Sequence, residues 1–76
     1  MVDSRLVNVT VLVDEKHWNR MSQIAAALEL RGFVLREMLD SIGVLTGTVA
    51  ADQLPDLATT PGVVSAEVER SDYHTQ

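Results

Sequence analysis

Histidines and acidic residues are the side chains of this sequence that could bind a metal ion or transfer a proton. Cysteine is absent from the 76 residues, which excludes disulfides, thiolate ligands and a cysteine nucleophile. His17 and His74 stand at opposite ends of the chain without a His-x-x-x-His spacing, whereas a metal site needs three or four converging ligands. We therefore predict neither a metal nor another cofactor, and we interpret both histidines as solvated.

Glu67 and Glu69 form a pair of carboxylates at alternate positions. On a strand both would point to one side, about 7 Å apart. Such a pair catalyses proton transfer when one carboxyl is buried beside a substrate pocket, and an open sheet provides neither condition. The serines lack nucleophile motifs, and Lys16 lies among charged residues that leave its amine solvated. These residues predict a protein that is not an enzyme.

The composition indicates one small folded domain, residues 1–76, with an acidic surface. A hydrophobic content of 46% is too high for a disordered chain. The formal net charge is −5 and the six basic residues are scattered singly, so no run of them can neutralise successive phosphates. We expect neither nucleic acid nor a membrane as a partner. The N-terminus has no apolar segment after its first charges, which predicts a cytoplasmic protein without a secretory signal.

Hydrophobic periodicity predicts the elements of the N-terminal half. Alternating β-branched residues predict a strand over 6–13. Apolar residues three and four apart predict a helix from His17 to Arg31, with Gly32 after its end. Residues 33–40 have mixed faces, which is typical of a bulged or edge strand.

The C-terminal half continues the alternation of strands and helices. A tight turn leads into a strand over 44–50, in which Gly47 is unfavourable unless a side chain approaches closely there. A short helix is expected over 51–59 and a last strand over 63–69. Residues 70–76 have no periodicity and are expected to form an extended tail.

The resulting βαββαβ order predicts a ferredoxin-like α+β sandwich, a four-stranded antiparallel sheet with two helices on one face. Residues expected in the core are Val9, Val11, Trp18, Met21, Leu28, Leu45, Leu57 and Val68. Residues expected on the bare face are Asn8, Thr10, Leu12, Thr46, Thr48, Val63, Ser65, Glu67 and Glu69. Exposed Leu and Val on such a small domain indicate a contact with another protein or with a second copy. We expect a homodimer at high concentration, through sheet faces or edge strands.

The C-terminal half resembles the subtilisin-propeptide family of peptidase inhibitors. The resemblance covers roughly residues 33–76 and rests on Gly43-Val44-Leu45-Thr46-Gly47-Thr48-Val49, then Leu54, Leu57, Pro61-Gly62-Val63 and Val68-Glu69. It implies that the bare sheet packs on a serine peptidase and that Glu67 and Glu69 cap helix N-termini of the enzyme. It also implies that the C-terminal residues lie in the active site like a product; these are Tyr73, His74, Thr75 and Gln76.

The N-terminal half, with Trp18 and the helix around Ala25-Ala26-Ala27, looks like small stand-alone bacterial proteins sometimes labelled ketohydroxyglutarate aldolase. Three functions are therefore compatible with the sequence. The first is a propeptide-like inhibitor or protein-binding module, and the second is a non-catalytic homo-oligomeric domain of regulatory or structural role. The third is an aldolase, whose Schiff base would depend on Lys16 alone.

Overall fold

The computed structural model describes residues 5–69 of the chain. The tail expected over 70–76 lies outside the described residues. Two short 3-10 segments, η1 (Glu15–Arg20) and η2 (Ala51–Gln53), precede the two α-helices. The other elements, in chain order, are β1 (Leu6–Val13), α1 (Met21–Glu29), β2 (Val34–Leu39), β3 (Val44–Ala50), α2 (Leu54–Ala58) and β4 (Val63–Val68).

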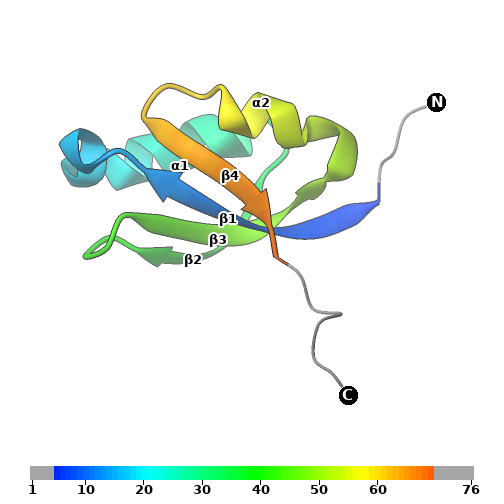
Figure 1. Ribbon diagram of the computed structural model, residues 1–76, viewed down its shortest axis with the longest axis horizontal. Helices are drawn as coiled ribbons and strands as arrows, with labels where there is room; N and C mark the ends of the chain where they lie inside the picture. The colour runs from blue at the N-terminus through cyan, green and yellow to red at the C-terminus, as the bar shows by residue number, and fades with distance from the viewer. Residues whose placement is uncertain (1–4, 70–76) are drawn as a thin grey trace, which may run out of the picture.

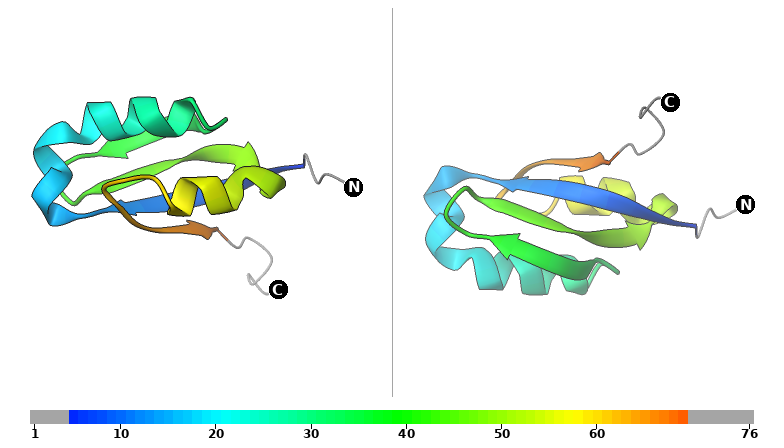
Figure 2. Two further views of the ribbon diagram at one scale, coloured as in Figure 1. Left: turned by 90° about the horizontal axis from the view of Figure 1, so that it is seen from above. Right: turned by 90° about the horizontal axis from the view of Figure 1, so that it is seen from below.

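The four strands form one antiparallel sheet in the order β2-β3-β1-β4 (Figure 1). Each helix crosses over one intervening strand, so β1 and β3 are central and β2 and β4 are the edges. Figure 2 shows both helices over the sheet when it is seen from above, and the strands in front when it is seen from below. The predicted ferredoxin-like α+β sandwich is confirmed.

The helical region after β1 begins differently from the prediction. Asp14 caps η1 by accepting a hydrogen bond from the Lys16 amide at 3.0 Å, and the regular α-helix starts only at Met21. Trp18 therefore lies in the 3-10 segment, half-buried, and its indole N–H donates to the Val13 carbonyl at 2.9 Å. A Cβ on Gly43 would collide with this indole, so the ring packs directly on the turn before β3.

Replacing Trp18 with Phe should lower the free energy of unfolding by about 1 kcal/mol, because the Val13 carbonyl loses its indole donor. Chemical denaturation followed by circular dichroism measures this loss. Tryptophan fluorescence is unsuitable here, because the substitution removes the single Trp of the protein. Lys16→Ala, at an exposed position of the same segment, is the control and should change stability by less than about 0.5 kcal/mol. Equal stability of the two variants would contradict the anchoring role of the indole.

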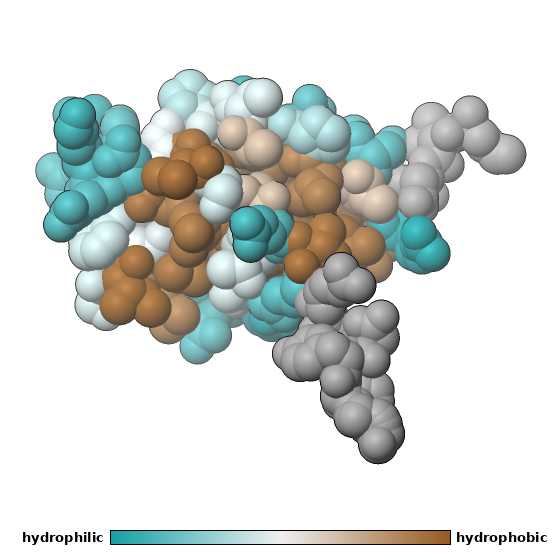
Figure 3. Space-filling view, in the orientation of Figure 1, coloured by the Kyte–Doolittle hydropathy of each residue, from teal (hydrophilic) through white to brown (hydrophobic). Residues whose placement is uncertain are grey.

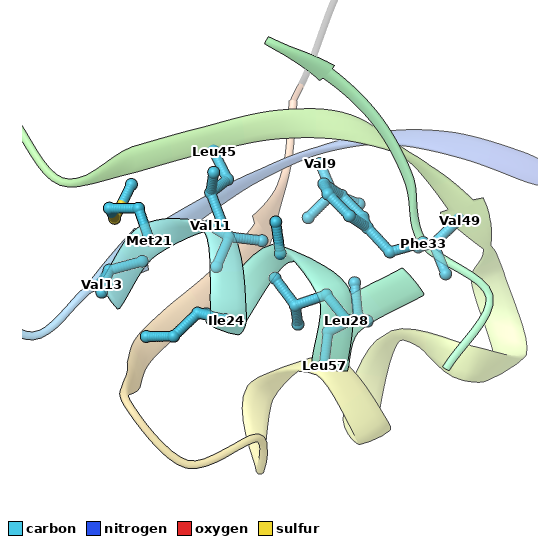
Figure 4. Packing of buried hydrophobic residues seen from close by; sticks show 11 residues of the cluster. Val9, Val11, Val13, Met21, Ile24, Leu28, Phe33, Leu45, Val49 and Leu57 are labelled. Atoms are coloured by element: carbon cyan, nitrogen blue, oxygen red, sulfur yellow. The ribbon is translucent and has the colours of Figure 1, made fainter. Parts of the chain in front are cut away.

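The core lies between the helices and one face of the sheet (Figure 4). Its buried hydrophobic residues are Val9, Val11, Val13, Met21, Ile24, Ala25, Leu28, Phe33, Leu45, Val49 and Leu57. Six of the eight residues expected in the core are among them, whereas Trp18 packs against it half-buried. Val68 was expected there wrongly and is 42% exposed, because it ends an edge strand that has a neighbour on one side only.

Two register irregularities decide which strand residues reach the core. The register shifts between Leu12 and Val13, which pairs Val13 with Val63. Val63 therefore packs against the core, which corrects its expected place on the bare face, and Val64 is exposed instead. A second shift lies between Leu35 and Glu37 and confirms the predicted bulge in the edge strand β2.

Candidate functional site: the open face of the sheet

The sheet face opposite the helices, called the open face below, is the candidate functional site. Along β1, core residues alternate with residues that point away from the helices. Residues of the other strands that pair with the second set lie on the same face of the sheet. The residues assigned to the open face are Leu6, Asn8, Thr10 and Leu12 of β1, Val34, Glu37 and Leu39 of β2, Val44, Thr46, Thr48 and Ala50 of β3, and Ser65, Glu67 and Glu69 of β4 and its end.

A row of polar residues crosses the middle of the open face. From β2 to β4 this central row consists of Glu37, Thr46, Thr10 and Glu67. Arg36, at the bulge of β2, places its Nη2 3.5 Å from Oε2 of Glu69. Because β3 and β1 separate these two residues, the ion pair spans the width of the sheet. The Thr10 hydroxyl donates to the same Glu69 oxygen at 3.0 Å.

The two glutamates singled out by the sequence therefore have different environments. Both lie on the open face, but the Glu69 carboxylate already binds Arg36 and Thr10. Glu67 is exposed and forms no ion pair with any residue from 5 to 69. Of the two, Glu67 is the carboxylate available to a partner.

Thr46 lies on the open face as expected but is buried there, with 8% of its surface exposed. Its hydroxyl has no hydrogen-bond partner within the described part of the chain. Thr46 occupies the row between Glu37 and Thr10, in the part of the face that the Arg36–Glu69 pair spans. Neither the role of Arg36 nor the burial of Thr46 was predicted from the sequence. The mixed faces of residues 33–40 indicate an irregular strand. They do not show at which residue the bulge lies, and therefore they do not predict which side chains reach the open face.

Apolar side chains flank the central row on both sides. Toward the β2–β3 turn, Leu39, Val44 and Leu12 pair in succession across three strands, and the exposed Val64 lies beside them at the register shift of β4. On the other side, Val34 and Leu6 are each more than half exposed. Figure 3 shows hydrophobic residues reaching the surface around β4 and β1, with hydrophilic groups between them. This pattern of exposed Leu and Val is typical of a protein contact.

The remaining candidate residues do not add a second site. His74 and the other residues expected in a peptidase cleft, Tyr73, Thr75 and Gln76, lie outside the described residues. Between residues 5 and 69 no three His, Asp or Glu side chains are placed to hold a metal ion. Neither helix of that stretch has the length and apolar character required to cross a membrane.

Comparisons with known proteins give no further assignment. No family model, curated protein or solved structure matches the chain. The likenesses to propeptides and to the labelled aldolases therefore stay predictions from the residues. The open face, with its charged row and apolar flanks, is the feature on which a function can be based.

Proposed function

We propose that this protein is a small protein-binding module of the subtilisin-propeptide type, which packs its open face on a serine peptidase and inhibits it. The observation that supports the proposal is a sheet covered by helices on one side only, with Leu6, Leu12 and Val34 exposed on the other side. Burying such side chains against a partner removes apolar surface from water at about 25 cal/mol per Å².

Binding accounts for the acidic pair better than catalysis does. A general acid needs a buried carboxyl beside a substrate pocket, whereas Glu67 is exposed and Glu69 is engaged by Arg36 and Thr10. An exposed carboxylate at a sheet edge suits a helix N-terminus of a partner, where each such contact is worth about 0.3–1 kcal/mol and is screened by salt.

The propeptide likeness assigns the inhibitory contact to the C-terminal residues. In this proposal residues 73–76 extend through the peptidase cleft as a strand, paired with the enzyme through backbone hydrogen bonds. Tyr73 provides the largest side-chain contact, because large aromatic side chains are frequent anchors of such interfaces. The polar terminal residue Gln76 limits the affinity, so we expect inhibition at micromolar rather than nanomolar concentration.

Deleting Tyr73 to Gln76 should abolish inhibition of subtilisin while the melting temperature stays unchanged. The measurement is a titration of subtilisin activity with the intact and the shortened protein, beside thermal unfolding of both. No inhibition by the intact protein at micromolar concentration would contradict the proposal, as would inhibition that survives the deletion.

The alternative is a non-catalytic domain that associates with its own copies. The same exposed residues of the open face favour it, together with two edge strands, β2 and β4, that each have a neighbour on one side only. Absence of inhibition combined with a dimer in sedimentation equilibrium would select this alternative. A species of 8.3 kDa at millimolar concentration would exclude it.

A further inference from the structure

We propose that the open face is matched to a protein surface with a cationic centre and apolar flanks, and that Arg36 acts as an internal counter-ion that weakens this match. The inference rests on the proposed use of the open face as a docking surface and specifies the chemistry of the partner. It does not depend on the partner being a peptidase.

The open face has a net negative charge. Among residues 5–69, one arginine and three glutamates lie in or beside the central row, namely Arg36, Glu37, Glu67 and Glu69, and their formal charges sum to −2. Arg36 balances Glu69, so the uncompensated charges are Glu37 and Glu67 at the two edges of the sheet. Both are exposed. Three strand spacings separate their backbones, which is about 14 Å.

This charge distribution argues against a second copy as the occupant. A two-fold axis through the middle of the open face lays the central row on the same row of the other molecule. The two glutamates of each row, Glu37 and Glu67, then face the same two glutamates of the other copy, with an Arg36–Glu69 pair beside each row. Like charges brought together at an interface oppose association. A partner with basic residues about 14 Å apart, and apolar residues beside them, complements both the row and its flanks.

Arg36 sets how negative the face is. Replacing it with Gln would leave Glu69 bound to Thr10 alone and change the charge of the face from −2 to −3. We therefore expect that removing the Arg36 side chain from the open face strengthens binding of a basic partner. A partner of opposite character, acidic at its centre, would bind more weakly to this variant.

The probes are three 18-residue helical peptides with the same leucine pattern and with Lys, Gln or Glu on the polar face. We expect the Lys peptide to bind the intact protein most tightly, more weakly as salt rises, and to shift amide NMR signals of Thr10, Thr46 and Glu67. Glu67→Gln and Glu37→Gln should each weaken its binding about twofold to fivefold, and Arg36→Gln should strengthen it by a similar factor.

Matched controls separate the site from general attraction to an acidic protein. Glu29→Gln removes the same charge from the exposed end of α1 and should leave binding within about 1.5-fold. Leu12→Ser, on the open face, should weaken binding, whereas Leu30→Ser, at an exposed position after α1, should not. Circular dichroism of each variant confirms that it is folded.

Four outcomes would overturn the inference. They are equal binding of the Lys and Gln peptides, an effect of Glu29→Gln as large as that of Glu67→Gln, weaker binding after Arg36→Gln, or a homodimer that Leu12→Asp dissociates. Failure of the proposed function is distinguishable, because subtilisin inhibition can be absent while the Lys peptide maps to the open face. Conversely, inhibition that is insensitive to Arg36→Gln and Glu67→Gln, together with equal binding of the Lys and Gln peptides, would support the peptidase and reject the charge match.

Discussion

A Leu28→Ala variant is expected to lose about 2–5 kcal/mol of its free energy of unfolding. Leu28 has no exposed surface and lies in α1 among the buried residues of the sheet and α2. Removal of its side chain loses the transfer free energy of the deleted carbon atoms and leaves a cavity that α1 cannot close by itself. A domain of this size has only about 4–11 kcal/mol in total, so the variant should be at the margin of stability.

Leu30 provides a matched control, because it lies two residues after Leu28, directly after the end of α1, and is 88% exposed. Leu30→Ala should change stability by less than about 0.5 kcal/mol. Urea denaturation followed by Trp18 fluorescence compares the two variants with the parent, and Leu28→Met, expected to lose less than about 1.5 kcal/mol, replaces Leu28→Ala if that protein does not fold. A loss below half a kcal/mol at position 28, or similar losses at 28 and 30, would show that the helices do not cover the sheet as described.

Local sequence patterns were sufficient to predict most of the architecture. The alternation of valines located β1 at 6–13, and the β-branched run located β3 at 44–50, in agreement with the structure. The order of elements then allowed few arrangements of the strands and helices in space, because crossover connections have a fixed hand. The start of α1 was missed, since apolar spacing of three and four does not distinguish a 3-10 turn over 15–20 from the first turns of an α-helix.

The open face was predictable as a whole, but not in its contacts. Strict alternation placed Val63 on the wrong face, because the register shift opposite Leu12 and Val13 depends on how two distant strands pair. The same limit hid the Arg36–Glu69 ion pair, which joins residues 33 positions apart across two intervening strands. Glu67 and Glu69 look alike in sequence, and only this cross-sheet contact distinguishes them.

Gly47 is the second position at which a small change should have a large effect. It lies in the middle of β3, on the helix side, opposite Val9 and Leu35. A Cβ placed there would collide with the Val34 carbonyl and approach the Phe33 ring, with Cζ at 2.7 Å. This confirms the expectation that a side chain approaches closely at this glycine. Phe33 is itself buried, so its ring has little room to move.

Two effects of opposite sign compete in a Gly47→Ala variant. The backbone at Gly47 does not have a positive φ, so Ala should gain about 0.4–1 kcal/mol by restricting the unfolded chain. Overpacking costs about 1–3 kcal/mol or more, and here the obstacle includes backbone held in the β2–β3 pairing, which cannot rotate away as a side chain can. We therefore expect a net loss of about 2 kcal/mol.

A double variant tests the cause of this loss. Phe33→Leu shortens the side chain over Gly47, so Gly47→Ala combined with Phe33→Leu should lose less than the sum of the two single variants, by at least about 0.5 kcal/mol. The Val34 carbonyl is still close to residue 47 in the double variant, so part of the loss caused by Gly47→Ala should persist. Thr48→Ala, the next residue on the opposite face, is the control and should lose less than about 1 kcal/mol. If Gly47→Ala were as stable as the parent in urea denaturation, the Phe33 ring could not lie against β3, and the close packing of β2 on β3 would be wrong.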